Sequence, residues 1–232
     1  MPDVKAKEKF SFSQFIVPHF AKKFTLMMTA IILMGFFLSF LIEIGWGTDP
    51  ATFMNLNIAH ALGWTLGNWQ LTINVGMLAL VFVFLPKLIG FGTIANMVLI
   101  GYTADFFCWL WRTTGVAASI SGASLCPKII FFALSIICFV IVAAVYMNAQ
   151  MGLSPYDGTP KLMELVLPFL PAFVVRMIFD FLVILVGYIA SRFSPDGMQG
   201  SLIGVTAMAF LLGPVITVTG RFMNKYVLNF DD

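Results

Sequence analysis

Long apolar runs with almost no charge decide what this chain can fold into. Several reach about 18 residues or more, the length at which a helix crosses the roughly 30 Å hydrocarbon core of a bilayer. The runs lack the alternation in segments of about ten residues that is typical of membrane barrels. Charged residues make up 10% of the 232 residues, against about 25% in soluble domains. We therefore expect an all-α membrane protein.

Six apolar segments are long enough to span a bilayer, and two others are too short. The expected spans are 25–46, 68–86, 93–113, 128–149, 172–192 and 201–222. The short segments are about 50–62 and 156–168, and we expect each to be a re-entrant or interfacial half-helix. Together they form a single transmembrane domain, 25–223, between a basic and aromatic segment, 1–24, and a tail, 224–232.

The placement of Lys and Arg predicts the orientation, because cytoplasmic loops carry an excess of both. With the N-terminus inside, nine lie on the inner side and three on the outer side, leaving out Arg176 within a span. The inner residues are Lys5, Lys7, Lys9, Lys22, Lys23, Lys87, Lys161, Arg221 and Lys225, and the outer ones are Arg112, Lys128 and Arg192. We expect a multi-pass protein of the cell membrane, surrounded by lipids, with both termini in the cytoplasm.

Short motifs recur in the same order in the two halves of the chain. The matched pairs are Gly47-Thr48-Asp49-Pro50 with Gly152-Leu153-Ser154-Pro155, Gln70 and Asn74 with Arg176 and Asp180, and Gly92-Thr93 with Gly200-Ser201. Their offsets are 105, 106 and 108 residues. Three spans per repeat is an odd number, so repeats at about 25–113 and 128–222 would lie in opposite orientations. Inverted repeats of this kind are common in secondary transporters.

The two half-helices are expected to begin at Asp49 and Ser154, because each precedes a proline. Asp and Ser are favoured N-caps, and proline suits the first helical position. The free N–H groups there could bind an anion or a polar ligand if they are buried. Plain capping explains the same pattern. Asp157 falls in the first turn of its half-helix, where a carboxylate also favours the helix dipole.

Charged residues inside the spans are a second candidate feature, because such groups are costly in lipid. Arg176 and Asp180 are four residues apart and share one helix face, so they can form a structural ion pair. Alternatively, Arg176 holds an anionic group, and Asp180 positions that group or relays a proton. Gln70 and Asn74 occupy the equivalent face in the other half, and the four side chains could line one site. Asp105 is a candidate proton relay in the third span.

The chain lacks the sequence signatures of several enzyme classes. It contains no H-E-x-x-H helix, P-loop, G-x-G-x-x-G run or G-x-S-x-G elbow, which are mechanistic motifs of known families. Its two histidines and three cysteines supply no metal pattern, and a net charge of +2 indicates no nucleic-acid partner. We expect a non-enzymatic protein without a cofactor or metal.

At these motifs the chain resembles the YczE/YyaS/YitT group of bacterial membrane proteins over about residues 30–215. The motifs are Gly47-Thr48-Asp49-Pro50, Gly90-Phe91-Gly92-Thr93-Ile94-Ala95-Asn96 with Gly101, Gly152-Leu153-Ser154-Pro155-Tyr156-Asp157-Gly158, and Val175-Arg176 with Asp180 and Gly187. Asp49 and the segment 196–201 depart from the pattern of the group. The resemblance implies a bacterial inner-membrane location and carries no substrate.

The function that these features favour is a small secondary transporter or permease for a small polar or anionic solute. A substrate-binding subunit of a larger importer and a non-catalytic accessory or regulatory protein are the main alternatives, and a membrane enzyme is the last. A homodimer is compatible with each. Uptake of a solute by the reconstituted protein would separate the first function from the others.

Overall fold

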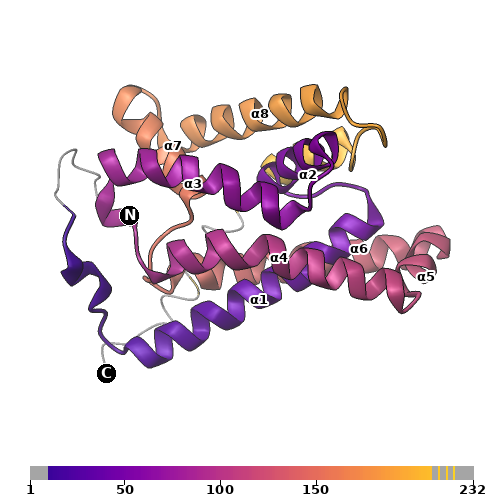
Figure 1. The fold of residues 1–232 in the computed structure, drawn as a ribbon, viewed down its shortest axis with the longest axis horizontal. Coiled ribbons are helices and arrows are strands. Elements are labelled where there is room, and N and C mark those ends of the chain that lie inside the picture. The colour runs from indigo at the N-terminus through magenta and orange to yellow at the C-terminus, as the bar shows by residue number, and fades with distance from the viewer. Residues whose placement is uncertain (1–9, 211–213, 215–217, 219–221, 223–232) are drawn as a thin grey trace.

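The computed structural model describes residues 10–210 and, beyond them, residues 214, 218 and 222. Over these residues all regular structure is helical, and five helices are long and apolar enough to cross a membrane. They are α1 (Phe20–Ile44), α3 (Leu66–Phe84), α4 (Phe91–Thr113), α6 (Leu125–Asn148) and α8 (Ala172–Ser191). The expectation of a helical, multi-pass membrane protein agrees with this architecture (Figure 1).

The two expected half-helices are present as α2 (Pro50–Leu62) and α7 (Pro155–Val166). A third short helix, α5 (Val116–Gly122), and the turns η1 (Phe12–Phe15) and η2 (Pro86–Leu88) were not expected from the sequence. Residues 202–210 are helical. Most of the remainder of the expected sixth span, 201–222, lies outside the described residues, as do the tail 224–232 and residues 1–9 of the N-terminal segment.

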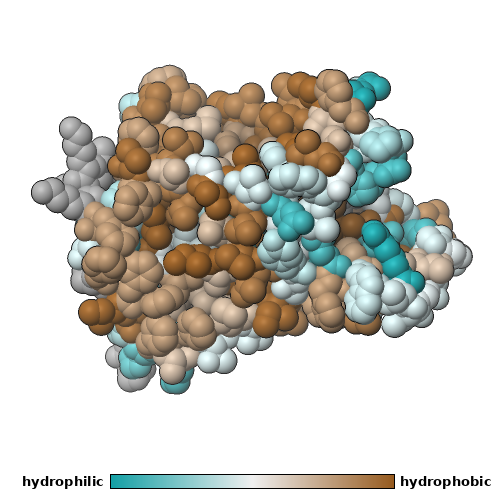
Figure 2. Space-filling view, viewed as in Figure 1, coloured by the Kyte–Doolittle hydropathy of each residue, from teal (hydrophilic) through white to brown (hydrophobic). Residues whose placement is uncertain are grey.

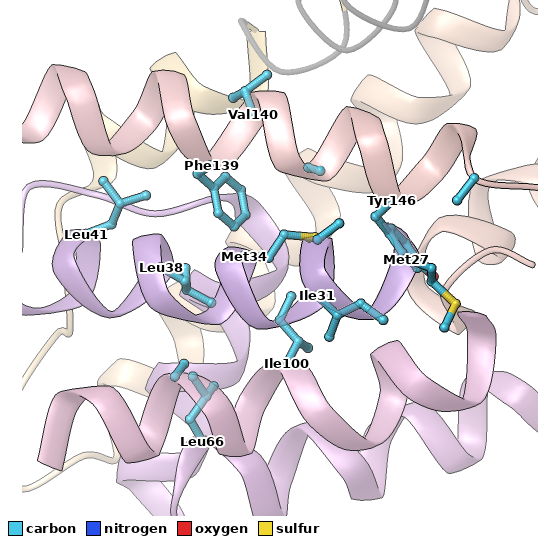
Figure 3. Packing of buried hydrophobic residues seen from close by; sticks show 14 of the residues in the cluster. Met27, Ile31, Met34, Leu38, Leu41, Leu66, Ile100, Phe139, Val140 and Tyr146 are labelled. Atoms are coloured by element: carbon cyan, nitrogen blue, oxygen red, sulfur yellow. The ribbon is translucent and has the colours of Figure 1, made fainter. Parts of the chain in front are cut away.

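The main apolar core surrounds α1, which packs against both α4 and α6. Met27, Ile31 and Leu38 of α1 are fully buried there, and Figure 3 shows them between the neighbouring helices. Small residues let helices in a membrane approach closely and gain dispersion contacts. Gly35 serves this purpose, because a Cβ atom there would lie 2.6 Å from the Cβ atom of Thr103 on α4.

The remaining helices pack in a crossed pattern. The short helix α2 lies mainly against α8, and the short helix α7 lies mainly against α3, while α2 also contacts α3 and α7 also contacts α8. Met54 of α2 is buried with Phe179 and Val183 of α8, and Met77 of α3 and Met163 of α7 pack against the same group. Four helices from both halves of the chain therefore meet at one place.

Two glycines bring distant backbone segments into direct contact. Gly47, with φ of +138°, precedes α2, and a Cβ atom there would lie 2.7 Å from the carbonyl carbon of Gly204. Gly152, with φ of +102°, precedes α7, and a Cβ atom there would lie 2.5 Å from the backbone nitrogen of Gly90. Because side chains rarely adopt these φ values and find no room, both crossings require glycine.

The described part of the N-terminal segment lies against the connection between α3 and α4. The side-chain amide of Gln14 donates a hydrogen bond to the carbonyl of Pro86 at 3.2 Å. The ring of Phe10 lies 5.3 Å from that of Phe82, and the ring of Phe15 lies 5.1 Å from that of Phe91. These aromatic contacts hold residues 10–15 against the folded helices.

The surface is predominantly hydrophobic. Figure 2 shows brown, hydrophobic residues over most of the visible face, with hydrophilic residues gathered toward the end where α5 and the loop after α8 lie. Exposed apolar side chains include Val83 on α3 and Ile130 on α6. Exposed apolar bands between polar ends are expected of helices that face lipid.

Candidate functional site

The site begins at the N-terminus of α7, where Ser154 and Asp157 bind one another. The Ser154 Oγ accepts a hydrogen bond from the backbone N–H of Asp157 at 3.1 Å and donates one to Asp157 Oδ2 at 2.6 Å. This is the expected N-cap, and Pro155 occupies the first helical position. The cap fixes the Asp157 carboxylate so that its other oxygen, Oδ1, faces α8.

Arg176 joins α7 to α8 through two carboxylates. Its Nη1 donates to Asp157 Oδ1 at 2.9 Å, and its Nε donates to Asp180 Oδ2 at 3.1 Å. The expected pair of Arg176 with Asp180 is therefore present, and Asp157 is a second partner from another helix. The Asp180 side chain is 7% exposed and that of Arg176 is 33% exposed. Charges removed from water in this way require such partners.

Tyr156 completes this group of contacts. Its hydroxyl donates a hydrogen bond to Asp180 Oδ1 at 2.8 Å, and the Arg176 guanidinium carbon lies 5.3 Å from its ring centroid, within cation–π range. Burial and the charge of Asp180 raise the pKa of Tyr156 well above its ordinary value, so that the hydroxyl keeps its proton. We call Ser154, Tyr156, Asp157, Arg176 and Asp180 the Arg176 network.

Asp49 brings the start of α2 to the same place. Its Oδ1 accepts a hydrogen bond from the backbone N–H of Thr52 at 3.1 Å, which is the expected N-cap. Its Oδ2 is buried and has no hydrogen-bond partner among the described residues. Burial raises the pKa of Asp49, the Thr52 hydrogen bonds lower it, and the charge of nearby Asp180 raises it further. The N-termini of both half-helices therefore lie beside one charged cluster, which consists of Asp49 and the Arg176 network.

Among the described residues, the charges of this cluster do not balance. Asp49, Asp157 and Asp180 supply three carboxylates, and Arg176 supplies the guanidinium that binds two of them. A further anion at this place would therefore meet an excess of negative charge. The arrangement is electrostatically suited to a proton or a cationic group, whereas the sequence suggested an anion.

Gln70 and Asn74 of α3 pack toward different neighbours. Asn74 is buried and Gln70 is partly buried. Asn74 is 4% exposed and shares the face of α3 that carries Met77 and Val81, where Val81 packs against Gly158 of α7. Gln70 lies against α4, because a Cβ atom at Gly101 would be 2.9 Å from Gln70 Oε1. The structure gives neither amide a hydrogen bond to the Arg176 network.

Asp105 of α4 caps the start of another helix, α3. Its Oδ2 accepts a hydrogen bond from the backbone N–H of Gly67 at 2.7 Å. Gly67 lies in the first turn of α3, where N–H groups lack partners within the helix. The carboxylate therefore connects α4 to the start of α3, apart from the Arg176 network.

A pocket of about 460 Å³ opens between the C-terminal ends of α1 and α4 and the start of α3. Polar and aromatic side chains in its wall include Thr48, His60, Trp64, Asp105, Trp109 and Arg112. Thr48 is 3% exposed and immediately precedes Asp49. The pocket thus reaches the residue next to the charged cluster.

Sequence reasoning did not assign a role to Tyr156, although it lies within the Ser154-Pro155-Tyr156-Asp157 motif. Its place one residue after the proline of a half-helix was a usable signal, because a side chain there lies close to the helix start. Among the described residues, no group of three His, Cys, Asp or Glu side chains is arranged to hold a metal ion.

Comparison with known proteins places the chain in one family. No curated protein and no solved structure is a match. Residues 21–221, which include every helix from α1 to α8 apart from the first residue of α1, match a family of unknown function, DUF6198. The chain therefore belongs to the DUF6198 family.

Proposed function

We propose that this protein is a small permease of a bacterial cell membrane that moves a polar solute across the bilayer at the Arg176 network. The observation that carries the proposal is the meeting of two half-helix starts, at Asp49 and Ser154, beside the buried Arg176 and Asp180. Ionisable groups among membrane helices are costly and mark solute or ion pathways in many membrane proteins. A purely apolar bundle would have no need of them.

A pseudo-two-fold relation between the halves of the chain supports this function. In that relation α2 corresponds to α7 and α3 to α8, and each half-helix packs mainly on the long helix of the other half. The close backbone contacts at the glycines follow the same relation, since Gly47 contacts Gly204 and Gly152 contacts Gly90. We infer two inverted repeats of three spans, with the sixth span starting near 202, and a site where the repeats meet, as in many secondary transporters.

The charge of the cluster supports a neutral or cationic solute. Arg176 already binds Asp157 and Asp180, so an incoming carboxylate or phosphate would add a further negative charge beside these two. A cationic or neutral polar group would instead meet carboxylate oxygens and the Tyr156 hydroxyl. The excess of Lys and Arg on one side further supports cytoplasmic termini.

Efflux from proteoliposomes tests the proposal. Vesicles are loaded with a defined mixture of isotope-labelled solutes that comprises neutral amino acids, polyols, primary amines and monocarboxylates. Mass spectrometry then measures the loss of each class over time. We expect one neutral or cationic class to leave faster than from protein-free vesicles, and Arg176→Ala and Asp180→Asn to abolish the difference.

The matched control is Lys161→Gln together with Glu164→Gln, which removes an ion pair of 2.9 Å on the same half-helix outside the network. This variant is expected to retain the efflux. Size-exclusion elution establishes that each variant is folded. Efflux of every class at the protein-free rate, or undiminished efflux in folded Arg176→Ala, would contradict the permease.

A further inference from the structure

Asp49 differs from the other two carboxylates of the cluster in how its oxygens are satisfied. Both oxygens of Asp157 have partners, Ser154 and Arg176, and both oxygens of Asp180 have partners, Tyr156 and Arg176. Asp49 accepts a hydrogen bond at Oδ1, and its buried Oδ2 has no partner among the described residues. A buried, unpartnered oxygen with a full share of negative charge is costly.

Over the part of the chain that the structure describes, Asp49 has no countercharge beside it. The charged or titratable groups that face it there are Asp180 of α8 and Tyr156 of α7. Neither α3 nor residues 202–210, which also pack near α2, contains a titratable side chain. Glu43, near the end of α1, is held by Arg112 at 2.9 Å. An ionised Asp49 is therefore opposed by Asp180 and stabilised only by the start of its own helix.

A pocket comes within one residue of this carboxyl. Its wall includes Thr48 and Leu56, which flank the first turns of α2. A pocket of about 460 Å³ has room for several water molecules, since each takes about 30 Å³ in the liquid. With the termini in the cytoplasm, it opens toward the outer side of the membrane.

We propose that Asp49 is the proton-binding residue of this permease, taking up a proton at Oδ2 from water in the pocket and releasing it after the site has changed its access. This inference rests on the proposed function. On uptake, a hydronium ion gives its proton to the carboxylate and leaves a water molecule. Protonation removes one negative charge beside Asp180, which weakens the repulsion between the start of α2 and the middle of α8. Release restores that repulsion, so the two states differ in electrostatic energy.

The test is infrared titration of the protein reconstituted in lipid. A protonated carboxyl absorbs at a different C=O stretching frequency from an ionised carboxylate. We expect the protonated-carboxyl absorption of the wild type to contain a band that grows as the pH falls, that is missing from the absorption of the remaining carboxyls in Asp49→Asn and that returns in Asp49→Glu. Asn is as good an N-cap as Asp, so Asp49→Asn is expected to keep α2 intact.

Asp196→Asn is the control, because Asp196 is a surface residue with a 68% exposed side chain, and it should leave the band unchanged. The same band in Asp49→Asn as in the wild type would overturn the proposal. So would a band that Na⁺, but not K⁺, abolishes at constant pH, since a sodium ion would then be the occupant.

The titration and the efflux measurement can reject the proton role of Asp49 and the permease independently of one another. A band that belongs to Asp49, together with protein-free efflux rates for every solute, would reject the permease and keep the proton site. Efflux that responds to pH identically in the wild type and in Asp49→Asn would keep the permease and reject the proton role of Asp49.

Discussion

Tyr156 is the residue that connects the three parts of the charged cluster. It donates to Asp180, lies beneath the Arg176 guanidinium and is near enough to Asp49 to be affected by its charge. A hydroxyl that cannot ionise at neutral pH is a permanent donor. It therefore holds Asp180 in place whether or not neighbouring carboxyl groups carry a proton.

Removal of this hydroxyl leaves one oxygen of Asp180 without its donor. We expect Tyr156→Phe to lower the free energy of unfolding by about 1–2 kcal/mol, because the abandoned carboxylate oxygen is buried while hydrogen bonds in membrane proteins are individually modest. Unfolding by sodium dodecyl sulfate in mixed micelles, followed by circular dichroism, measures the change.

Tyr188→Phe is the companion variant, since the Tyr188 hydroxyl contacts Arg192 at an exposed site on the same helix. It is expected to change the free energy of unfolding by less than about 0.5 kcal/mol. Equal effects of the two variants would mean that the contact with Asp180 contributes nothing particular to stability.

Among the helices, the half-helices were the most predictable from the sequence. α2 covers the expected 50–62, and α7 begins one residue before the expected start at 156, because N-cap and proline signals act within a few residues. Five of the six expected spans were identifiable from apolar length, with ends that differ by a few residues, and most of the sixth, 201–222, lies outside the described residues. The seven-residue α5 gave no comparable signal, since it is too short to show a period.

The contacts of the site were predictable only within one helix. The spacing of Arg176 and Asp180 indicated their ion pair. The bonds from Asp157 and Tyr156 of α7 depend on how two helices cross, which no local pattern encodes. Gln70 illustrates the same limit, because its place against Gly101 of α4 depends on the rotation of α3 about its axis.

The connection before α7 depends on the absence of a side chain at Gly152. We expect Gly152→Ala to lower the free energy of unfolding by about 2–4 kcal/mol, because a Cβ atom would meet the backbone of Gly90 and the φ angle is unfavourable for alanine. The same mixed-micelle unfolding measures it.

Gly76→Ala is the control variant, and we expect it to raise the free energy of unfolding. A Cβ atom at Gly76 of α3 meets nothing within 4 Å, and alanine in a helix interior is favoured over glycine by about 0.5–1 kcal/mol. A Gly152→Ala protein as stable as the wild type would show that the close backbone crossing is absent in the membrane.

The proposed inversion of the two halves leads to a prediction about access. In a protein without its three natural cysteines, a single cysteine at Thr48 should react with a membrane-impermeant maleimide only from the outer side, through the pocket. A cysteine at Leu153 should react only from the inner side if the halves are inverted as we propose. Mass spectrometry of sealed, right-side-out and inside-out vesicles measures both. Reaction of both from the same side would rule out the inversion.

The crossed packing of α2 on α8 also has a consequence for synthesis on the ribosome. Some 110 residues separate the end of α2 at Leu62 from the start of α8 at Ala172. At about 5–20 residues per second, α8 emerges on the order of ten seconds after α2. During that interval α2 lacks α8, the helix on which it mainly packs. The insertion machinery, or early contacts with α1 and α3, must therefore cover α2 until α8 has been synthesised.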